Sequence, residues 1–294
     1  MIRTLILTEK EGWHYQQLKL SLTKLNHLVD SACISDISIT LNNNKAILEN
    51  KGERLPKIDN IIVRFIPGGT LEEIVFYLNI LKILESMNVR VVNNASSIES
   101  TVDKLYTSYL LNDNNINCPK TYVMRGQEAA SKFISNYHYE SKLIYKPLFG
   151  SQGDNIRLIE GSSDLDKLDN QTNIYYFQEY LENRPNHDYR VLVINNKNNI
   201  KYFYMTRYGD TFVNNFSKGA KCVKEKLNEE VIELAIKSSK LLNIDFCGVD
   251  IIEHNQKYYV IEVNSIPAWK GIQSVSSEIN IAEIMIDDFL KKCN

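Results

Sequence analysis

The sequence of 294 residues lacks a long apolar run, a paired arrangement of cysteines, and an excess of charge of either sign. No apolar stretch approaches the roughly 20 residues that a membrane-spanning helix needs. The first residues, MIRTLILTEKEGWH, have a short apolar run followed by charges, which makes a poor signal peptide. We therefore expect a cytoplasmic protein without a membrane partner.

The five cysteines are far apart in the chain and form no CxxC pair. This spacing argues against a zinc site or a disulfide framework, and scattered free thiols are typical of a reducing cytosol. The net charge of −2 argues against a general nucleic-acid-binding protein, which usually has a basic excess. The composition leaves the oligomeric state open, and a homo-oligomer is one of the states that it allows.

The pattern of apolar residues changes along the chain, and the change predicts two kinds of architecture. Up to about residue 95, strand-like runs at 2–8, 34–40 and 61–65 alternate with helix-like segments at 13–28 and 71–87. That alternation predicts a small α/β domain with a mostly parallel sheet. A helix is expected over residues 96–111, with Ser96 and Glu99 as a capping box. From about residue 122 strands dominate, which predicts an α+β architecture.

Three oxygen-bearing side chains interrupt two apolar strands near the C-terminus. Asp250 lies within residues 246–252, and Glu262 and Asn264 share one face of residues 258–264 because they are two positions apart. A hairpin turn centred near Gln256 would bring Asp250 across from Glu262, within a residue of register. Two carboxylates and an amide oxygen suit Mg²⁺ shared with phosphates. The alternative is two ordinary strands with solvent-facing polar residues, which the β-branched and aromatic residues around these three positions disfavour.

A turn of small residues follows the strand expected at 143–147. Gly150, Ser151 and Gly153 would let backbone N–H groups approach an anion closely, although a plain β-hairpin loop fits these residues equally well. No helix is expected next and no GK[ST] sequence ends the turn, so it is not a Walker A loop. Lys146 favours the phosphate interpretation, because an unpaired ammonium inside an apolar strand would be costly.

Other polar residues carry weaker signals: an ordinary strand end explains residues 178–180 equally well, and an ordinary surface position is the more common explanation for the rest. These polar residues are Lys104 on the expected helix 96–111, Gln178, Glu179 and Tyr180 at the end of an aromatic strand, Asp188 and Arg190 on one face of the next strand, and Arg207, Asn215 and Lys218 in a polar, basic stretch. Arginine is suited to bidentate contact with phosphate or carboxylate.

In their order along the chain, these pieces resemble the ATP-grasp superfamily and, within it, the RimK-like alpha-L-glutamate ligases. The resemblance runs from about residue 93 to the C-terminus and is carried by residues 102–104, 145–153, 178–180, 188–190, 216–220, 248–250 and 262–267. It implies an ATP-grasp fold of mixed α/β and α+β class. The N-terminal α/β domain would span 1–95, a central and lid domain 96–180, and a C-terminal metal-binding domain 181–294.

The resemblance also implies roles for single residues. Lys104 and Lys146 resemble the two lysines that contact ATP phosphates, and Gly150, Ser151, Gln152 and Gly153 resemble the lid over them. Gln178, Glu179 and Tyr180 match the hinge on the adenine side, and Asp188 and Arg190 match the motif after it. Arg207 resembles an arginine that stabilises the acyl-phosphate transition state, and Asp250, Glu262 and Asn264 resemble the ligands of two Mg²⁺ or Mn²⁺ ions. Apart from the resemblance, we take Arg64 or Lys218 as the residue that would hold the carboxylates of the acceptor, because either cation could pair with them.

The sequence departs from the family pattern at two places. Asn155, preceded by Asp154, stands where many family lids have a second small residue, and asparagine tolerates a left-handed backbone better than most residues. Ala268 stands where the family has a glycine after the proline. These departures put the geometry of the lid in question, but not the metal site.

The implied activity is that of an ADP-forming ligase, which activates a carboxylate as an acyl phosphate and joins it to the amine of L-glutamate. Residues 62–73, 148–150 and 268–273 resemble the subgroup that includes tetrahydromethanopterin:alpha-L-glutamate ligase, which implies a pterin-type acceptor. Relatives also modify protein tails, the deazaflavin F420 and amino-acid carrier proteins, so a protein, peptide or F420-type acceptor stays open. A regulatory ATP-binding protein without catalysis is the alternative from another class, and the retained carboxylates argue against it.

Overall fold

The computed structural model describes residues 1–294 except 138–141, 151–154, 171, 196–198, 210–218 and 292–294. The chain begins with a four-stranded parallel sheet in the order β2-β1-β6-β7. Its elements are β1 (Arg3–Leu7), α1 (Trp13–Lys24), β2 (Leu28–Ala32), β6 (Asn60–Val63), α2 (Leu71–Ser86) and β7 (Arg90–Val92). The α/β domain expected from the sequence is confirmed.

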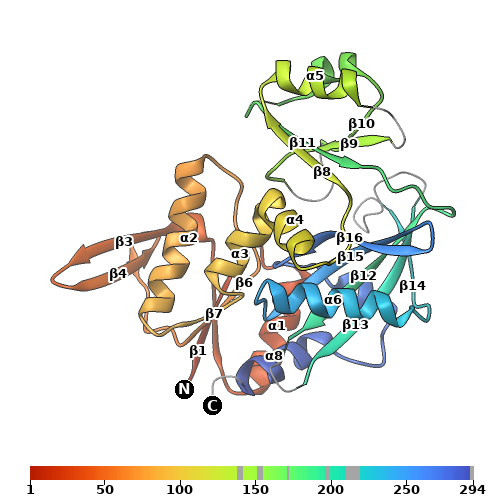
Figure 1. The fold of residues 1–294 in the computed structure, drawn as a ribbon. Coiled ribbons are helices and arrows are strands. Elements are labelled where there is room, and N and C mark those ends of the chain that lie inside the picture. The colour runs from red at the N-terminus through yellow and green to blue at the C-terminus, as the bar shows by residue number, and fades with distance from the viewer. Residues whose placement is uncertain (138–141, 151–154, 171, 196–198, 210–218, 292–294) are drawn as a thin grey trace.

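Both faces of this sheet are covered, which explains why the consecutive residues Leu5, Ile6 and Leu7 of β1 are all apolar. Leu5 and Leu7 pack with residues of α2 on one face. Ile6 packs on the other face with residues of α1 and of the C-terminal helix α8 (Ile281–Lys291). A short 3-10 turn (Ile34–Asp36) and a separate antiparallel sheet of β3 (Ile37–Asn42), β4 (Lys45–Asn50) and β5 (Glu53–Arg54) form the arm that projects beside α2 in Figure 1.

The helix expected over residues 96–111 is two helices, α3 (Ala95–Val102) and α4 (Lys104–Asp113). The break falls at Asp103, whose side chain accepts a hydrogen bond from the Tyr106 N–H at 3.0 Å and so caps α4. The expected capping box at Ser96 is wrong, because Asn94 is the N-cap of α3 and accepts from the Ser97 N–H. The break is important for the site, since it makes Lys104 the first residue of α4.

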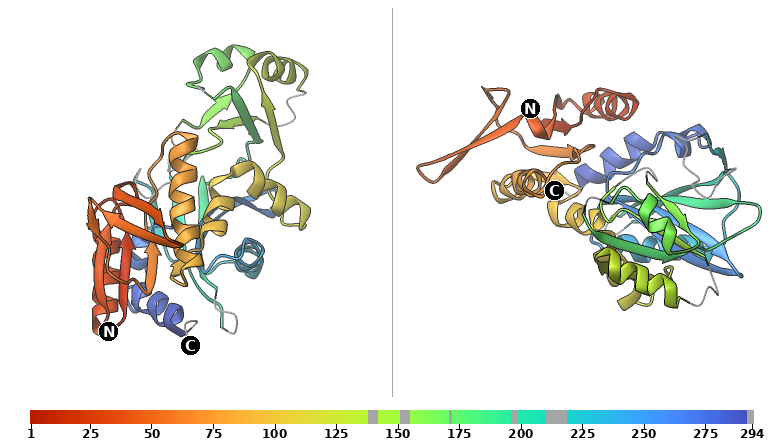
Figure 2. Two further views of the ribbon diagram at one scale, coloured as in Figure 1. Left: turned by 90° about the vertical axis from the view of Figure 1, so that its left-hand side faces the viewer. Right: turned by 90° about the horizontal axis from the view of Figure 1, so that it is seen from above.

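A second antiparallel sheet, in the order β10-β9-β11-β8, stands apart from the rest of the molecule above α4 (Figures 1 and 2). It consists of β8 (Thr121–Arg125), β9 (Leu143–Lys146), β10 (Arg157–Ile159) and β11 (Ile174–Glu179). Helix α5 (Gln127–Asn136) and a 3-10 turn (Ser162–Lys167) pack on one face of it, around Ala130, Ile134, Leu143 and Phe177.

The third sheet has five antiparallel strands in the order β14-β13-β12-β15-β16. They are β12 (His187–Ile194), β13 (Lys201–Tyr208), β14 (Lys221–Val223), β15 (Phe246–His254) and β16 (Lys257–Asn264). Helix α6 (Glu229–Leu241) covers one face. On the other face lie α1, α8 and α7 (Lys270–Ser274), so that one apolar cluster joins this sheet to the N-terminal sheet. Within the described residues, no helix is long and apolar enough to cross a membrane.

Candidate active site

The β15–β16 hairpin brings together the carboxylates that the sequence singled out. Asn255 and Gln256 form its turn, with φ of 49° and 61°. The register pairs Asp250 with Glu262 and Gly248 with Asn264, which confirms the predicted juxtaposition of the two carboxylates. A bulge after Asp250 shifts the pairing beyond it. The bulge lies outside the part of the hairpin that pairs Glu262 and Asn264, so these two residues stay on one face of β16, at the end where the strand leaves the sheet.

Asp250 is the centre of a buried network of two aspartates and two arginines. Arg190, directly across from it on β12, donates through Nε and, at 2.7 Å, through Nη2. Arg207 Nη2 lies 3.1 Å from Oδ1 of Asp250. Arg207 also makes a bidentate pair with Asp188, donating from Nε to Oδ1 at 2.6 Å and from Nη2 to Oδ2 at 2.8 Å. All four residues are at most 9% exposed. The charges balance within the network, which is what allows four ionised groups to lie in an interior.

This network changes the interpretation of Asp250. Burial alone would raise the pKa of its carboxyl, but the guanidinium groups of Arg190 and Arg207 outweigh burial and hold the pKa below the usual value. The carboxylate is therefore ionised and lines the cavity described next, with both oxygens already bonded to arginine. Arg190 itself lies behind Asp250 and is not among the residues that line the cavity.

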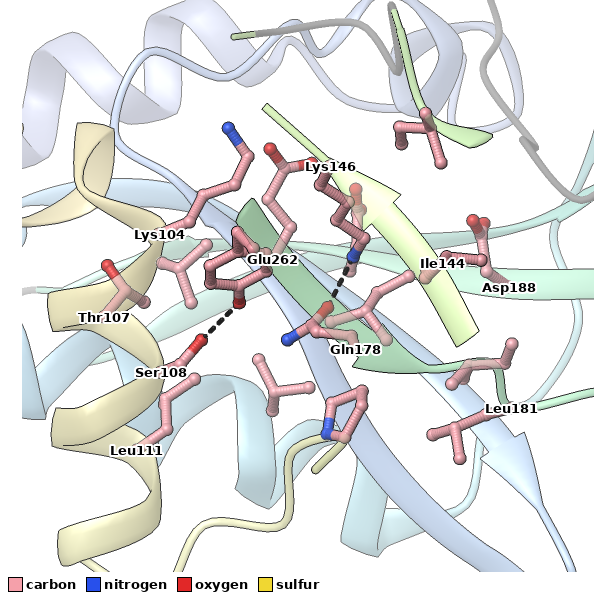
Figure 3. A pocket seen from close by; sticks show the side chains of 18 of the residues that line it. Lys104, Thr107, Ser108, Leu111, Ile144, Lys146, Gln178, Leu181, Asp188 and Glu262 are labelled. Carbon is pink, nitrogen blue, oxygen red and sulfur yellow. Dashed lines mark hydrogen bonds between the residues drawn. The ribbon is translucent and has the colours of Figure 1, made fainter. Parts of the chain in front are cut away.

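A cavity opens between the β8–β11 sheet, α4 and the β15–β16 hairpin, and its charged end is formed by two lysines and Glu262 (Figure 3). Lys104 donates from Nζ to the carbonyl oxygens of Leu148 at 3.2 Å and Gly150 at 2.9 Å. Lys146, at the end of β9, donates to Oε1 of Gln178 at 2.7 Å. Among the described residues, the acceptors that hold the two ammonium groups near Glu262 are neutral, and both groups keep free donor capacity there.

Burial lowers the pKa of both lysines, and nearby Glu262 only partly opposes this effect. For Lys146 the pKa falls to about 8, and the neighbouring charge of Lys104 contributes to that fall. Asp250 also raises the pKa of Lys146, and Asp103 that of Lys104, yet burial prevails for both lysines. Two desolvated ammonium groups with spare N–H donors suit a polyanion, because a phosphate chain would stabilise their charged forms.

The other end of the cavity is mainly apolar and suits a flat ring. It is lined by Leu111, Pro119, Ile144, Ile156, Leu181, Ile252 and Val260. Tyr176 spans it with a hydroxyl 2.8 Å from that of Ser108, and Gln178 is fixed by a bond from Nε2 to Thr121 at 3.0 Å. Glu179 and Tyr180 also line it, and their backbone N–H groups bond to the carbonyls of Lys120 and Lys142. The Glu179 carboxylate faces Lys120, 3.3 Å away.

The remaining expected residues have different places. Ser151, Gln152, Gly153, Asp154, Asn215 and Lys218 lie outside the described residues. Asn155 has a left-handed backbone with φ of 57°, which asparagine tolerates, as expected. Arg64 does not line the cavity and lies over the ring of Trp269, beyond the end of β16. The proposed roles of all these residues stay predictions.

Hard-oxygen donors from the hairpin fit a divalent cation shared with phosphates, although they form no closed protein cage. Glu262 and Asp250 line the cavity, and Asn264 follows on the same face as Glu262. Among the described residues no group of three or more His, Cys, Asp or Glu side chains could hold a metal. An open set of two carboxylates and an amide oxygen suits Mg²⁺, which usually keeps several ligands from water and substrate.

Sequence reasoning missed two residues that position this site. Asn93 is fully buried, and its amide donates to the carbonyls of Phe246 and Ser265 while its oxygen accepts from the N–H groups of Asp245 and Phe246. Thr101, which lines the cavity, bonds to the Ser265 hydroxyl at 2.6 Å. Both tie the N-terminal half to the connection that leaves β16. The only signal in the sequence is a polar pair, Asn93-Asn94, directly after an apolar strand.

Close packing explains why position 248 is a glycine, which the sequence motif alone did not explain. A Cβ at this position would lie 3.0 Å from Cβ of Pro267 and 3.1 Å from Nη1 of Arg190. A side chain here would therefore displace the arginine that holds Asp250.

Comparison with known proteins gives concordant matches over nearly the whole chain. Residues 101–289 match the RimK-like ATP-grasp domain, and residues 2–98 match the RimK PreATP-grasp domain. The chain is 31% identical over 288 residues to the tetrahydromethanopterin:alpha-L-glutamate ligase of Methanosarcina acetivorans, with 86% of this chain and 87% of the relative covered. It is 28% identical to the protein of the same name from Methanococcus maripaludis, with 97% of each chain covered.

Solved structures show the same fold. The crystal structure of a RimK domain ATP-grasp protein from Sphaerobacter thermophilus matches with a TM-score of 0.70 at 16% identity. The match covers 98% of this chain and 99% of that chain. The overall fold of this chain therefore recurs in a known protein.

Proposed function

Since the chain belongs to the RimK-like ATP-grasp family and is an ATP-grasp ligase, we propose that it joins L-glutamate to a carboxylate of a pterin-type cofactor while converting ATP to ADP and phosphate. The observation that carries the proposal is the convergence of Lys104, Lys146 and Glu262 on one end of a cavity whose other end is apolar. That polarity matches a nucleotide, with phosphates at the charged end and the base among the apolar side chains.

The reaction would have two steps. A carboxylate oxygen of the acceptor attacks the γ-phosphorus of ATP, the bond to the β-phosphate oxygen breaks, and an acyl phosphate and ADP form. The amine of L-glutamate then attacks the acyl carbon, phosphate leaves, and the amine loses a proton to give the amide. ATP-grasp chemistry of this kind depends mainly on positioning and charge neutralisation.

The described residues would divide this work between them. Lys104 and Lys146 would hold the phosphate chain, and Gln178 orients Lys146 toward it. Arg207, held in place by Asp188 and Asp250, would face the charge that develops during phosphoryl transfer. Two Mg²⁺ or Mn²⁺ ions bound by Glu262, Asn264 and Asp250 would neutralise the phosphate oxygens.

The pterin acceptor is proposed from the relatives, which are named tetrahydromethanopterin:alpha-L-glutamate ligases and align over most of the chain. The test is to incubate the protein with ATP, Mg²⁺, L-glutamate and a panel of acceptors, following ADP by a coupled assay and products by mass spectrometry. We expect one ADP per amide with a tetrahydropterin that carries a carboxylate. Amide formation only on a peptide, protein tail or F420-type acceptor would refute the pterin assignment. A lack of ADP release with every acceptor would favour a regulatory nucleotide-binding protein.

A further inference from the structure

The N-terminal sheet has a topological switch point, and Arg64 lies at it. The chain passes from β1 to β2 on one side and then to β6 on the other side of β1. In open α/β sheets, ligands bind in the crevice outside the carboxyl ends of the strands at such a reversal. Arg64 directly follows β6, and its backbone N–H donates to the Leu7 carbonyl at the end of β1 at 2.8 Å.

The guanidinium of Arg64 lacks the partners that a buried arginine normally has. Its Nε and Nη1 are buried and make no hydrogen bond in the described part of the chain. It lies 4.7 Å over the Trp269 ring, and none of the ion pairs among the described residues includes it. Burial lowers its pKa to about 9. Arg64 as a whole is partly exposed, but its Nε and Nη1 groups are desolvated without an acceptor, which is costly and points to a ligand that supplies one.

Two uncharged polar groups, His14 and the Trp269 indole, lie beside Arg64. His14, in the first turn of α1, accepts at Nε2 from the Trp269 N–H at 3.1 Å. Burial, followed by the charges of Arg64 and Lys270, lowers the pKa of His14 to about 3, so it is neutral. The Trp269 indole Nε1 is also buried without a partner among the described residues. Helix α1 begins at Gly12 with no side-chain cap and no acidic residue in its first turn.

We propose that Arg64 and the Trp269 indole N–H form a binding subsite for a substrate carboxylate that does not react. This proposal rests on the ligase function proposed above and specifies how the same site recognises its substrates. Trp269 is five residues from Asn264, which places the subsite at most about 17 Å along the chain from the expected metal ligands. The Thr101–Ser265 bond ties that connection to the cavity wall.

The carboxylate could come from L-glutamate or from the tail of the acceptor. Titration calorimetry with the full-length protein separates these sources, using L-glutamate, L-glutamine, and a carboxylate-bearing pterin with its descarboxy analogue as probes. Arg64→Met should weaken binding of the recognised probe by about tenfold to a hundredfold, the usual effect of losing a charge-assisted hydrogen bond. Arg64→Lys should restore part of the affinity, and inorganic phosphate should bind far more weakly than the recognised carboxylate.

Arg90→Met is the matched control, because Arg90 also lies over an aromatic ring, Phe289, but is paired with Asp245 at 3.3 Å. It should leave carboxylate affinity unchanged. A second readout is the free energy of unfolding without ligand, which Arg64→Met should leave equal or increase, since it removes an unpaired buried charge. A purely structural arginine would give a loss of stability instead.

Unchanged affinity of Arg64→Met for both carboxylate probes would overturn the subsite. The outcome is independent of the proposed chemistry. A wild-type protein that binds the carboxylate through Arg64 but forms no amide would refute the proposed function and keep the subsite. Amide formation by Arg64→Met with an unchanged KM for both substrates would refute the subsite and keep the proposed function.

Discussion

Lys146 has its pKa lowered from 10.5 to about 8 in the nucleotide-free protein, mainly by burial, and a bound phosphate chain should reverse that shift. Above about pH 7.5 the nucleotide phosphates are fully ionised, because their second pKa is near 6. The proton must then be taken up from solvent when the nucleotide binds. At about pH 8, where Lys146 is half protonated when free, the expected uptake is about half a proton per nucleotide.

The magnitude follows from the two pKa values of Lys146. If bound phosphates restore the ordinary value, the difference of about 2.5 units corresponds to about 3 kcal/mol of coupling. Near pH 7 about nine-tenths of the free protein carries the proton on Lys146, and near pH 9 about one-tenth does. Nucleotide binding should therefore weaken as the pH rises, by about tenfold between about pH 7 and about pH 9.

The assay is titration calorimetry of Mg-ADP in buffers of different ionisation enthalpy, at about pH 7, 8 and 9. Lys146→Met should bind more weakly near pH 7 and should lose most of the proton uptake near pH 8. Lys104→Met is the comparison: it removes a charge that lowers the pKa of Lys146 but keeps the Lys146 ammonium, so it should retain part of the proton uptake near pH 8. Uptake near zero in the wild type at about pH 8, or uptake unchanged in Lys146→Met, would refute the reasoning.

Three further substitutions test the site and its supports. Glu262→Ala should abolish Mg²⁺-dependent ADP release while leaving urea unfolding unchanged, and near-normal release would contradict the metal assignment. Arg207→Met should lower the free energy of unfolding by about 3–5 kcal/mol, because it leaves Asp188 buried without its bidentate partner. Urea titration measures this loss, and a value under about 1 kcal/mol would show that the network is solvated. Asn93→Ala should cost at least about 2 kcal/mol in the same measurement, since it leaves buried groups of Phe246 and Ser265 unpaired, and an unchanged midpoint would contradict that.

Local sequence patterns predicted the parts of the fold that depend on neighbouring residues. The alternation of strand-like runs, such as the one that contains β1, with helix-like segments, such as α2, predicted the N-terminal α/β unit, which the structure confirms. The register of the β15–β16 hairpin also followed from sequence, because the pairing of Asp250 with Glu262 needs only a short turn between two strands. One helix was expected where there are two, because the apolar stripe runs across Asp103 and hides the cap that begins α4.

Contacts between residues far apart in the chain could not be predicted from the sequence. Strand β12 lies between β13 and β15, so Arg190 meets Asp250 across a gap of 60 residues. No periodicity along the chain predicts that contact, and Asp250 was expected as a metal ligand without its two arginines. The same holds for Arg64, whose place over Trp269 depends on how the N-terminal sheet packs against the connection after β16.

The central claim is that this cavity activates a carboxylate as an acyl phosphate, and an isotope measurement tests it most directly. The acceptor carboxylate is labelled with oxygen-18 and incubated with the protein, Mg-ATP and L-glutamate, and the released phosphate is analysed by mass spectrometry. The account predicts one labelled oxygen in each phosphate formed together with the amide. Amide formation with unlabelled phosphate would contradict it.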